Sequence, residues 1–158
     1  MCIWAVACVP TAAWAHGKHV HGEAQLQAAV SQSQITLQLA LPLEVAVGFE
    51  RQPRTDVEKQ ALIQAEKTLQ NATALWQPSA AANCQVKKVE VLMPTSDGAH
   101  ADITAHYRFE CAQPQSLKGI ETTIFQSFKR LYRIETQRIG PSGQGAARLT
   151  PKNPVINW

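Results

Sequence analysis

Residues 100–111 alternate between polar and apolar side chains almost without a break, and no other feature restricts the fold as much. Successive side chains of a β-strand leave opposite faces of a sheet, so this alternation predicts a strand with one buried and one polar face. The apolar face would carry Ala101, Ile103, Ala105, Tyr107, Phe109 and Cys111. The polar face would carry His100, Asp102, Thr104, His106, Arg108 and Glu110.

The same period of two recurs elsewhere in the chain. It covers residues 20–30 and 35–41, with a polar turn between them, and predicts a β-hairpin over residues 19–41. A further apolar stretch at 84–93 is followed by the turn sequence Pro-Thr-Ser-Asp-Gly. It would therefore pair with residues 100–111 as a second hairpin.

The N-terminal stretch indicates export. Residues 2–15 carry no charge, are mostly apolar and end in Ala-Trp-Ala, a pattern that signal peptidases cleave. We therefore predict a signal peptide over residues 1–15, cleaved after Ala15, and a single exported domain over residues 16–158.

Cleavage there would remove two of the four cysteines and leave Cys84 and Cys111. Two cysteines in an exported chain usually form a disulfide. They lie almost symmetrically about the turn of the second hairpin, so we expect a disulfide across its open end, with a β-bulge nearby.

One main helix is predicted between the hairpins. Thr55 and Glu58 match a capping box, and the helix would run to about Asn71. Its expected buried stripe is Val57, Ala61, Leu62, Ala65 and Leu69. Segments 42–53 and 72–83 are expected to be connections, and strands are expected at 117–125, 131–139 and 146–150. The sum is an α+β class, an antiparallel sheet of hairpins with one main helix.

Composition and motifs exclude several functions. The net charge of +3, from 15 basic and 12 acidic residues spread along the chain, is too small for a nucleic-acid-binding surface. No apolar run reaches the ~20 residues of a membrane span. The glycine-rich turn at 140–145 fits neither a phosphate-binding loop nor a nucleophile elbow, and we expect no enzyme. A zinc hydrolase with Glu23 or Glu50 as base ranks last among the alternatives.

All five histidines fall within residues 16–21 and 100–106. On a strand, His19, His21 and Glu23 would share one face, which suits capture of one metal ion. His100, Asp102 and His106 would share the polar face of the later strand. Imidazole with carboxylate favours Zn²⁺, with Cu²⁺ or Ni²⁺ as alternatives. Two other interpretations stay open: a merely solvated polar face, and a copper chelate at an N-terminal His16.

Several segments, in order, resemble the ZrgA-type family of zinc-regulated periplasmic proteins. They are His19-Val20-His21-Gly22-Glu23-Ala24, Val47-Gly48-Phe49-Glu50-Arg51, residues 105–111, and residues 140–151. The resemblance covers nearly all of the chain from His16 onward. It implies an exported, periplasmic, zinc-binding protein of zinc acquisition or homeostasis, without enzymatic activity.

The resemblance also ranks the ligands. It favours His19, His21 and His106, with His16 and His100 next. Three departures reduce the expected capacity to one core site: the His/Asp-rich loop is shortened to residues 94–99, Arg51 follows Gly-Phe-Glu where the family commonly has His, and Thr104 stands where the family often has His.

We therefore expect a carrier, buffer or accessory of zinc uptake that works with a zinc importer component. The alternative from a different class is a metal-free envelope interaction module.

Overall fold

The computed structural model describes residues 21–94 and 101–158. The predicted signal peptide and its cleavage site lie outside the described residues. The strands of the described part are β1 (Glu23–Ser31), β2 (Gln34–Pro42), β3 (Trp76–Pro78), β4 (Cys84–Leu92), β5 (Asp102–Cys111), β6 (Gly119–Thr122), β7 (Arg133–Gly140), β8 (Gly143–Leu149) and β9 (Val155–Asn157). The helices are α1 (Leu43–Val47), α2 (Asp56–Gln70), α3 (Ala72–Leu75) and α4 (Ile124–Ser127), with short 3₁₀ turns η1 (Ala80–Ala82) and η2 (Pro114–Ser116).

Six strands form one sheet in the order β4-β5-β2-β1-β7-β8. The hairpin predicted over residues 19–41 is confirmed as β1 and β2, which pair antiparallel with Gln25 opposite Ala40. All neighbouring pairs in this sheet are antiparallel except β1 with β7. The predicted α+β class, with an antiparallel-rich sheet, is confirmed.

The second predicted hairpin is formed by β4 and β5. Cys84 stands directly opposite Cys111, and the two form the expected disulfide. The expected bulge lies between Val86 and Lys88, where the register shifts. The bulge and the two lysines beside it also protect this edge strand from pairing with other chains.

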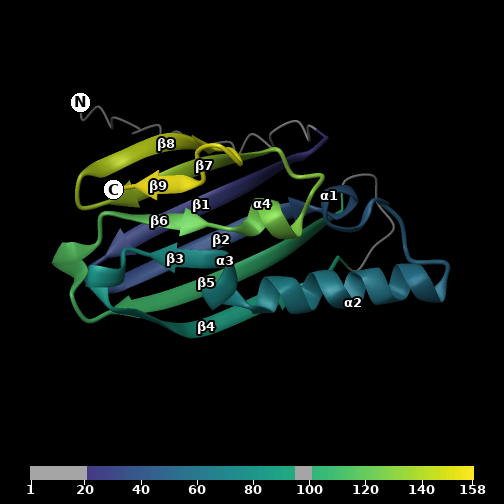
Figure 1. The fold of residues 1–158 in the computed structure, drawn as a ribbon, viewed down its shortest axis with the longest axis horizontal. Helices are drawn as coiled ribbons and strands as arrows, with labels where there is room; N and C mark the ends of the chain where they lie inside the picture. Colours follow the sequence, from purple (N-terminus) through teal and green to yellow (C-terminus); the bar gives the residue numbers. More distant parts are fainter. Residues whose placement is uncertain (1–20, 95–100) are drawn as a thin grey trace, which may run out of the picture.

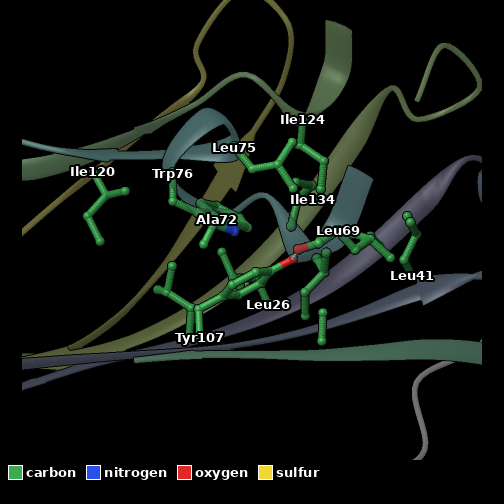
Figure 2. Close-up of a cluster of buried hydrophobic side chains, with 14 of the residues drawn as sticks. Leu26, Leu41, Leu69, Ala72, Leu75, Trp76, Tyr107, Ile120, Ile124 and Ile134 are labelled. Carbon is green, nitrogen blue, oxygen red and sulfur yellow. Dashed lines mark hydrogen bonds between the residues drawn. The ribbon is translucent and has the colours of Figure 1, made fainter. Parts of the chain in front are cut away.

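One face of the large sheet is covered by α2, α3, α4 and a smaller sheet in the order β3-β6-β9 (Figure 1). The core lies between these layers and contains the alternating apolar residues of β1, β2 and β5 (Figure 2). Tyr107 of β5 crosses this core: its hydroxyl donates a hydrogen bond to the Leu69 carbonyl at 2.9 Å, and its ring meets Trp76 edge-on (Figure 2). Sheet and helix layer are thus joined by a buried polar contact as well as by apolar packing.

The capping box at the start of α2 is confirmed. The Thr55 side chain accepts from the Glu58 amide, and the Glu58 carboxylate accepts from the Thr55 amide. The predicted buried stripe is only partly right. Ala65 and Leu69 are buried, but Val57 is 80% exposed, because the first turns of α2 extend past the end of the sheet (Figure 1).

Three of the expected connections and strands differ in the structure. Segment 42–53 contains α1, and segment 72–83 contains α3 and β3 with the buried Trp76. The strand expected over 117–125 is shorter, because α4 begins at Ile124. Apart from α1, these short elements belong to the covering layer, where tertiary contact decides which residues are buried and leaves no periodic pattern. No helix in residues 21–94 and 101–158 has the length and apolar character needed to cross a membrane.

Candidate metal centre

Two segments far apart in the sequence meet at one end of the large sheet. His21 lies just before β1, and Glu44 lies in the first turn of α1, just after β2. Continuing the antiparallel register of β1 and β2 four residues beyond the Gln25–Ala40 pair brings position 21 opposite position 44. The hairpin register therefore places an imidazole beside a carboxylate.

Glu50 completes this cluster. Nitrogen or oxygen atoms of His21, Glu44 and Glu50 all lie within 4.8 Å of one another, and we call these three residues the metal cluster. Nδ1 of His21 is 2.5 Å from Oε2 of Glu44. The His21 side chain is 83% exposed, whereas the Glu44 side chain is 28% exposed. The cluster is therefore open to solvent on the imidazole side.

The two carboxylates change the protonation of the histidine. The hydrogen bond that His21 makes to the Glu44 carboxylate raises the pKa of His21 above its ordinary value of 6.5, and the negative charges of Glu44 and then Glu50 add to the effect. Both acids stabilise a positive charge at this position. The negative charges of the same two carboxylates would also attract a divalent cation.

Glu50 is directed by a tight chain reversal after α1. Gly48 ends the helix with φ of +91°, a conformation that favours glycine, and its amide donates to the Glu44 carbonyl at 2.7 Å. Beyond Glu50, the Arg51 guanidinium lies over the Phe49 ring and forms a two-point ion pair with Glu58 at 2.7 and 3.1 Å. The loop that carries Glu50 is thus anchored to α2 on its far side.

Glu23, one of the predicted ligands, already has partners. Its side chain is buried, and its Oε1 atom accepts from the Tyr132 hydroxyl at 2.9 Å and from the Arg133 guanidinium. Hydrogen bonding to Glu23 is the main reason that the pKa of Tyr132 is raised. The negative charge of the Glu23 carboxylate is therefore already compensated within the protein.

The structure does not bring His106 to His21. His106 lies on β5 opposite Gln38, which itself lies opposite Gln27 of β1. That row crosses β1 six residues past His21, roughly 20 Å along the strand at ~3.3 Å per residue. His106 instead lines an open hollow of about 940 Å³ on the sheet, together with Gln27, Gln38 and Glu90.

Of the remaining predicted ligands, Asp102 is opposite Pro42, the residue before α1, and so lies toward the same end of the sheet as the metal cluster. His16, His19 and His100 lie outside the described residues.

Sequence reasoning did not propose Glu44 as a ligand, and it considered Glu50 only as a hydrolytic base and as part of a family motif. The sequence signal that could have found Glu44 is the register of the predicted hairpin. Extended four residues past the Gln25–Ala40 pair, this register places position 44 opposite position 21.

Comparison with known proteins identifies the family of this chain. A family model described as "ZrgA family zinc uptake protein" matches residues 18–158. The chain belongs to the ZrgA family. A search of curated proteins found no match to this chain. The family resemblance seen in the sequence is thereby confirmed, and it connects the chain with zinc uptake.

Proposed function

We propose that this ZrgA-family chain binds one Zn²⁺ ion at the metal cluster of His21, Glu44 and Glu50, and that it acts in the periplasm as a carrier or accessory of zinc uptake. The observation that carries the proposal is the convergence of the three donor groups within 4.8 Å. Family membership is the reason for choosing zinc as the metal, because the matching family is described as one of zinc uptake.

The chemistry of the donors suits zinc. One imidazole nitrogen and two carboxylate oxygens are ordinary zinc ligands, with metal–ligand distances of about 2.0–2.2 Å. Donors around a tetrahedral ion at that distance are about 3.3 Å apart. The separation of 2.5 Å between His21 and Glu44 must therefore widen, and the ion must displace the proton shared by the two groups.

The geometry favours exchange over permanent binding. Three protein ligands leave one tetrahedral position vacant for water or for a donor from another protein. Because the imidazole is largely exposed, an acceptor can approach the ion directly. Such an open site fits a protein that delivers zinc better than one that uses zinc to hold its fold.

The test is zinc affinity, measured by competition with a chelator, in the zinc-free protein and in paired variants. His21→Ala and Glu50→Gln should each lower the affinity at least tenfold. Their matched controls, His106→Ala on β5 and Glu121→Gln on β6, should stay within twofold of the unmodified protein.

Other outcomes contradict parts of the proposal. A large loss in His106→Ala with none in Glu50→Gln would reject the metal cluster and favour the histidine set predicted from sequence, for which His19→Ala gives the further check. A protein that takes up no zinc, and whose melting temperature zinc does not change, would favour the metal-free interaction module.

The cellular location has its own test. The intact mass of protein released from the periplasm should correspond to a chain beginning at His16 with the Cys84–Cys111 disulfide formed. A full-length mass, or recovery only from the cytoplasm, would contradict export. A bound copper ion on a chain that begins at His16 would favour the N-terminal chelate over the metal cluster.

A further inference from the structure

The residue that follows His21 is held in an unusual conformation. Gly22 has φ of +79°, which lies in the left-handed region, and its carbonyl accepts a hydrogen bond from the Tyr132 amide at 3.0 Å. A Cβ atom at this position would come within 2.4 Å of the Tyr132 ring and 3.1 Å of the Arg130 carbonyl. The Tyr132 ring therefore lies directly against the Gly22 backbone.

The next residue is held by the same tyrosine. The hydroxyl of Tyr132 donates to Oε1 of Glu23, which is also bonded to Arg133. Glu23 lies opposite Arg133 in the parallel pairing of β1 and β7, so this contact secures the first residue of β1 to its neighbouring strand. The side chain and the backbone amide of Tyr132 thus hold both residues that follow His21.

We propose that Tyr132 is a positioning residue of the zinc site: by holding Gly22 and Glu23, it directs the His21 imidazole toward Glu44 and Glu50. This inference rests on the proposed function and names a residue that the metal cluster does not contain. Tyr132 acts through the backbone at positions 22 and 23 and through the Glu23 carboxylate, and it is not a ligand.

The exposure of Tyr132 separates this role from ordinary packing. The residue is 48% exposed and is not part of the buried core. Its ring contributes less to burial than a core aromatic would, while its two hydrogen bonds both end on residues 22 and 23. Contacts that orient a metal ligand from outside the coordination sphere typically change affinity by about 10–100-fold when removed.

Two variants separate the contribution of the Tyr132 ring from that of its hydroxyl group. Tyr132→Phe keeps the ring against Gly22 and loses only the hydrogen bond to Glu23, whereas Tyr132→Ala loses both. We expect zinc affinity, measured by chelator competition, to fall about threefold in the first and at least tenfold in the second. Ile156→Val, in the buried core at β9, is the control that lowers the melting temperature without changing zinc affinity.

A double-mutant cycle with His21→Ala tests whether Tyr132 affects zinc binding through the His21 imidazole. If Tyr132 acts by directing the imidazole, Tyr132→Ala should lower zinc affinity in the unmodified protein and should have little further effect once the imidazole is gone. Equal losses in both backgrounds would overturn the positioning role, as would unchanged affinity in Tyr132→Ala.

Failure of the proposed function is recognised separately, because it would show as an unmodified protein that binds no zinc. The positioning role is then read from the His21 imidazole resonances in zinc-free protein. A clear shift of these resonances in Tyr132→Ala, absent in Ile156→Val, would support the role, and unchanged resonances would overturn it.

Discussion

Nδ1 of His21 lies 2.5 Å from Oε2 of Glu44, although 23 residues separate them in the chain. The β1–β2 hairpin and the turn of α1 that follows it create this contact. A slip of one residue in the hairpin would move the apolar side chains of a strand to the opposite face, so the buried core of β1 and β2 also protects the register at the site. Folding of the core and assembly of the metal cluster are thereby linked.

This contact predicts the titration of His21 in zinc-free protein. The midpoint should lie above 6.5, because the Glu44 hydrogen bond and then the carboxylate charges favour the imidazolium. Glu44→Gln should move the midpoint down toward 6.5, as followed by NMR of the imidazole protons. A variant remote from the site, Glu121→Gln, should leave it unchanged.

The raised pKa also sets the sign of the pH effect on stability. A group with a raised pKa in the folded state contributes its full stabilisation below its unfolded value of 6.5, and this contribution is lost as pH rises through the folded pKa. The effect should be small, because the pair is solvent-exposed. A His21 midpoint at or below 6.5 would contradict the ion pair.

Gly22→Ala should both destabilise the protein and weaken zinc binding. The left-handed backbone costs on the order of 1–2 kcal/mol for a residue with a Cβ, and the added atom would also displace the Tyr132 ring. Urea unfolding measures the first effect and chelator competition the second.

Gly143→Ala is the matched control, because Gly143 has φ of +99° but open space where its Cβ would lie. It should show the backbone cost alone and unchanged zinc affinity. Equal zinc affinities for the two variants would show that the contact between Gly22 and Tyr132 has no effect on zinc binding at the metal cluster.

The disulfide should matter for stability and not for the site. Cys84 and Cys111 close a loop with a sequence separation of 27, and in the chain-entropy model such a link contributes about 3–4 kcal/mol. Cys111 ends β5 at the opposite end from Asp102, roughly 30 Å away at ~3.3 Å per residue.

The double variant Cys84→Ser with Cys111→Ser should therefore unfold at lower urea concentration and still bind zinc with near-normal affinity once folded. Chemically reduced protein should behave in the same way. A tenfold loss of zinc affinity under conditions where circular dichroism shows a folded chain would contradict the separation of the two regions.

Much of the large sheet was accessible from sequence because its strands have one buried face. The alternation at 101–111 identified β5 with its inner side chains, and the apolar stretch at 84–93 with the turn after it identified its partner β4. In the covering layer, α2 and a longer version of β6 were predicted, but α3 and β3 were missed because such short elements are buried by contact with other elements, and nothing periodic marks them. Trp76 is the clearest case, a fully buried residue in a segment that was expected to be a connection.

The candidate site shows the same division. His21 was predicted as a ligand from its neighbours in sequence, but Glu44 and Glu50 come close to it only when β2 and α1 are in place. Glu23 was grouped with His21 because both were expected on one face of a strand, and His106 was added through the family resemblance. A buried contact with Arg133 occupies Glu23, and strand register carries His106 to another part of the sheet.

The capping box of α2 provides the last prediction, since Glu58 is bound by both Arg51 and the helix N-terminus. The Arg51 hydrogen bond, then the amides of Arg54 and Thr55, lower the pKa of Glu58 to about 2 from an ordinary value of 4.5. Its contribution to stability should therefore be present above pH 4.5 and lost as pH falls toward about 2. Glu58→Gln should be less stable than the unmodified protein at pH 7, and the gap should narrow with acidification below pH 4.5, in urea unfolding at several pH values. Glu66→Gln, on the same helix, should show no such narrowing, and a gap for Glu58→Gln that stays constant from pH 7 to pH 3 would contradict the ion pair with Arg51.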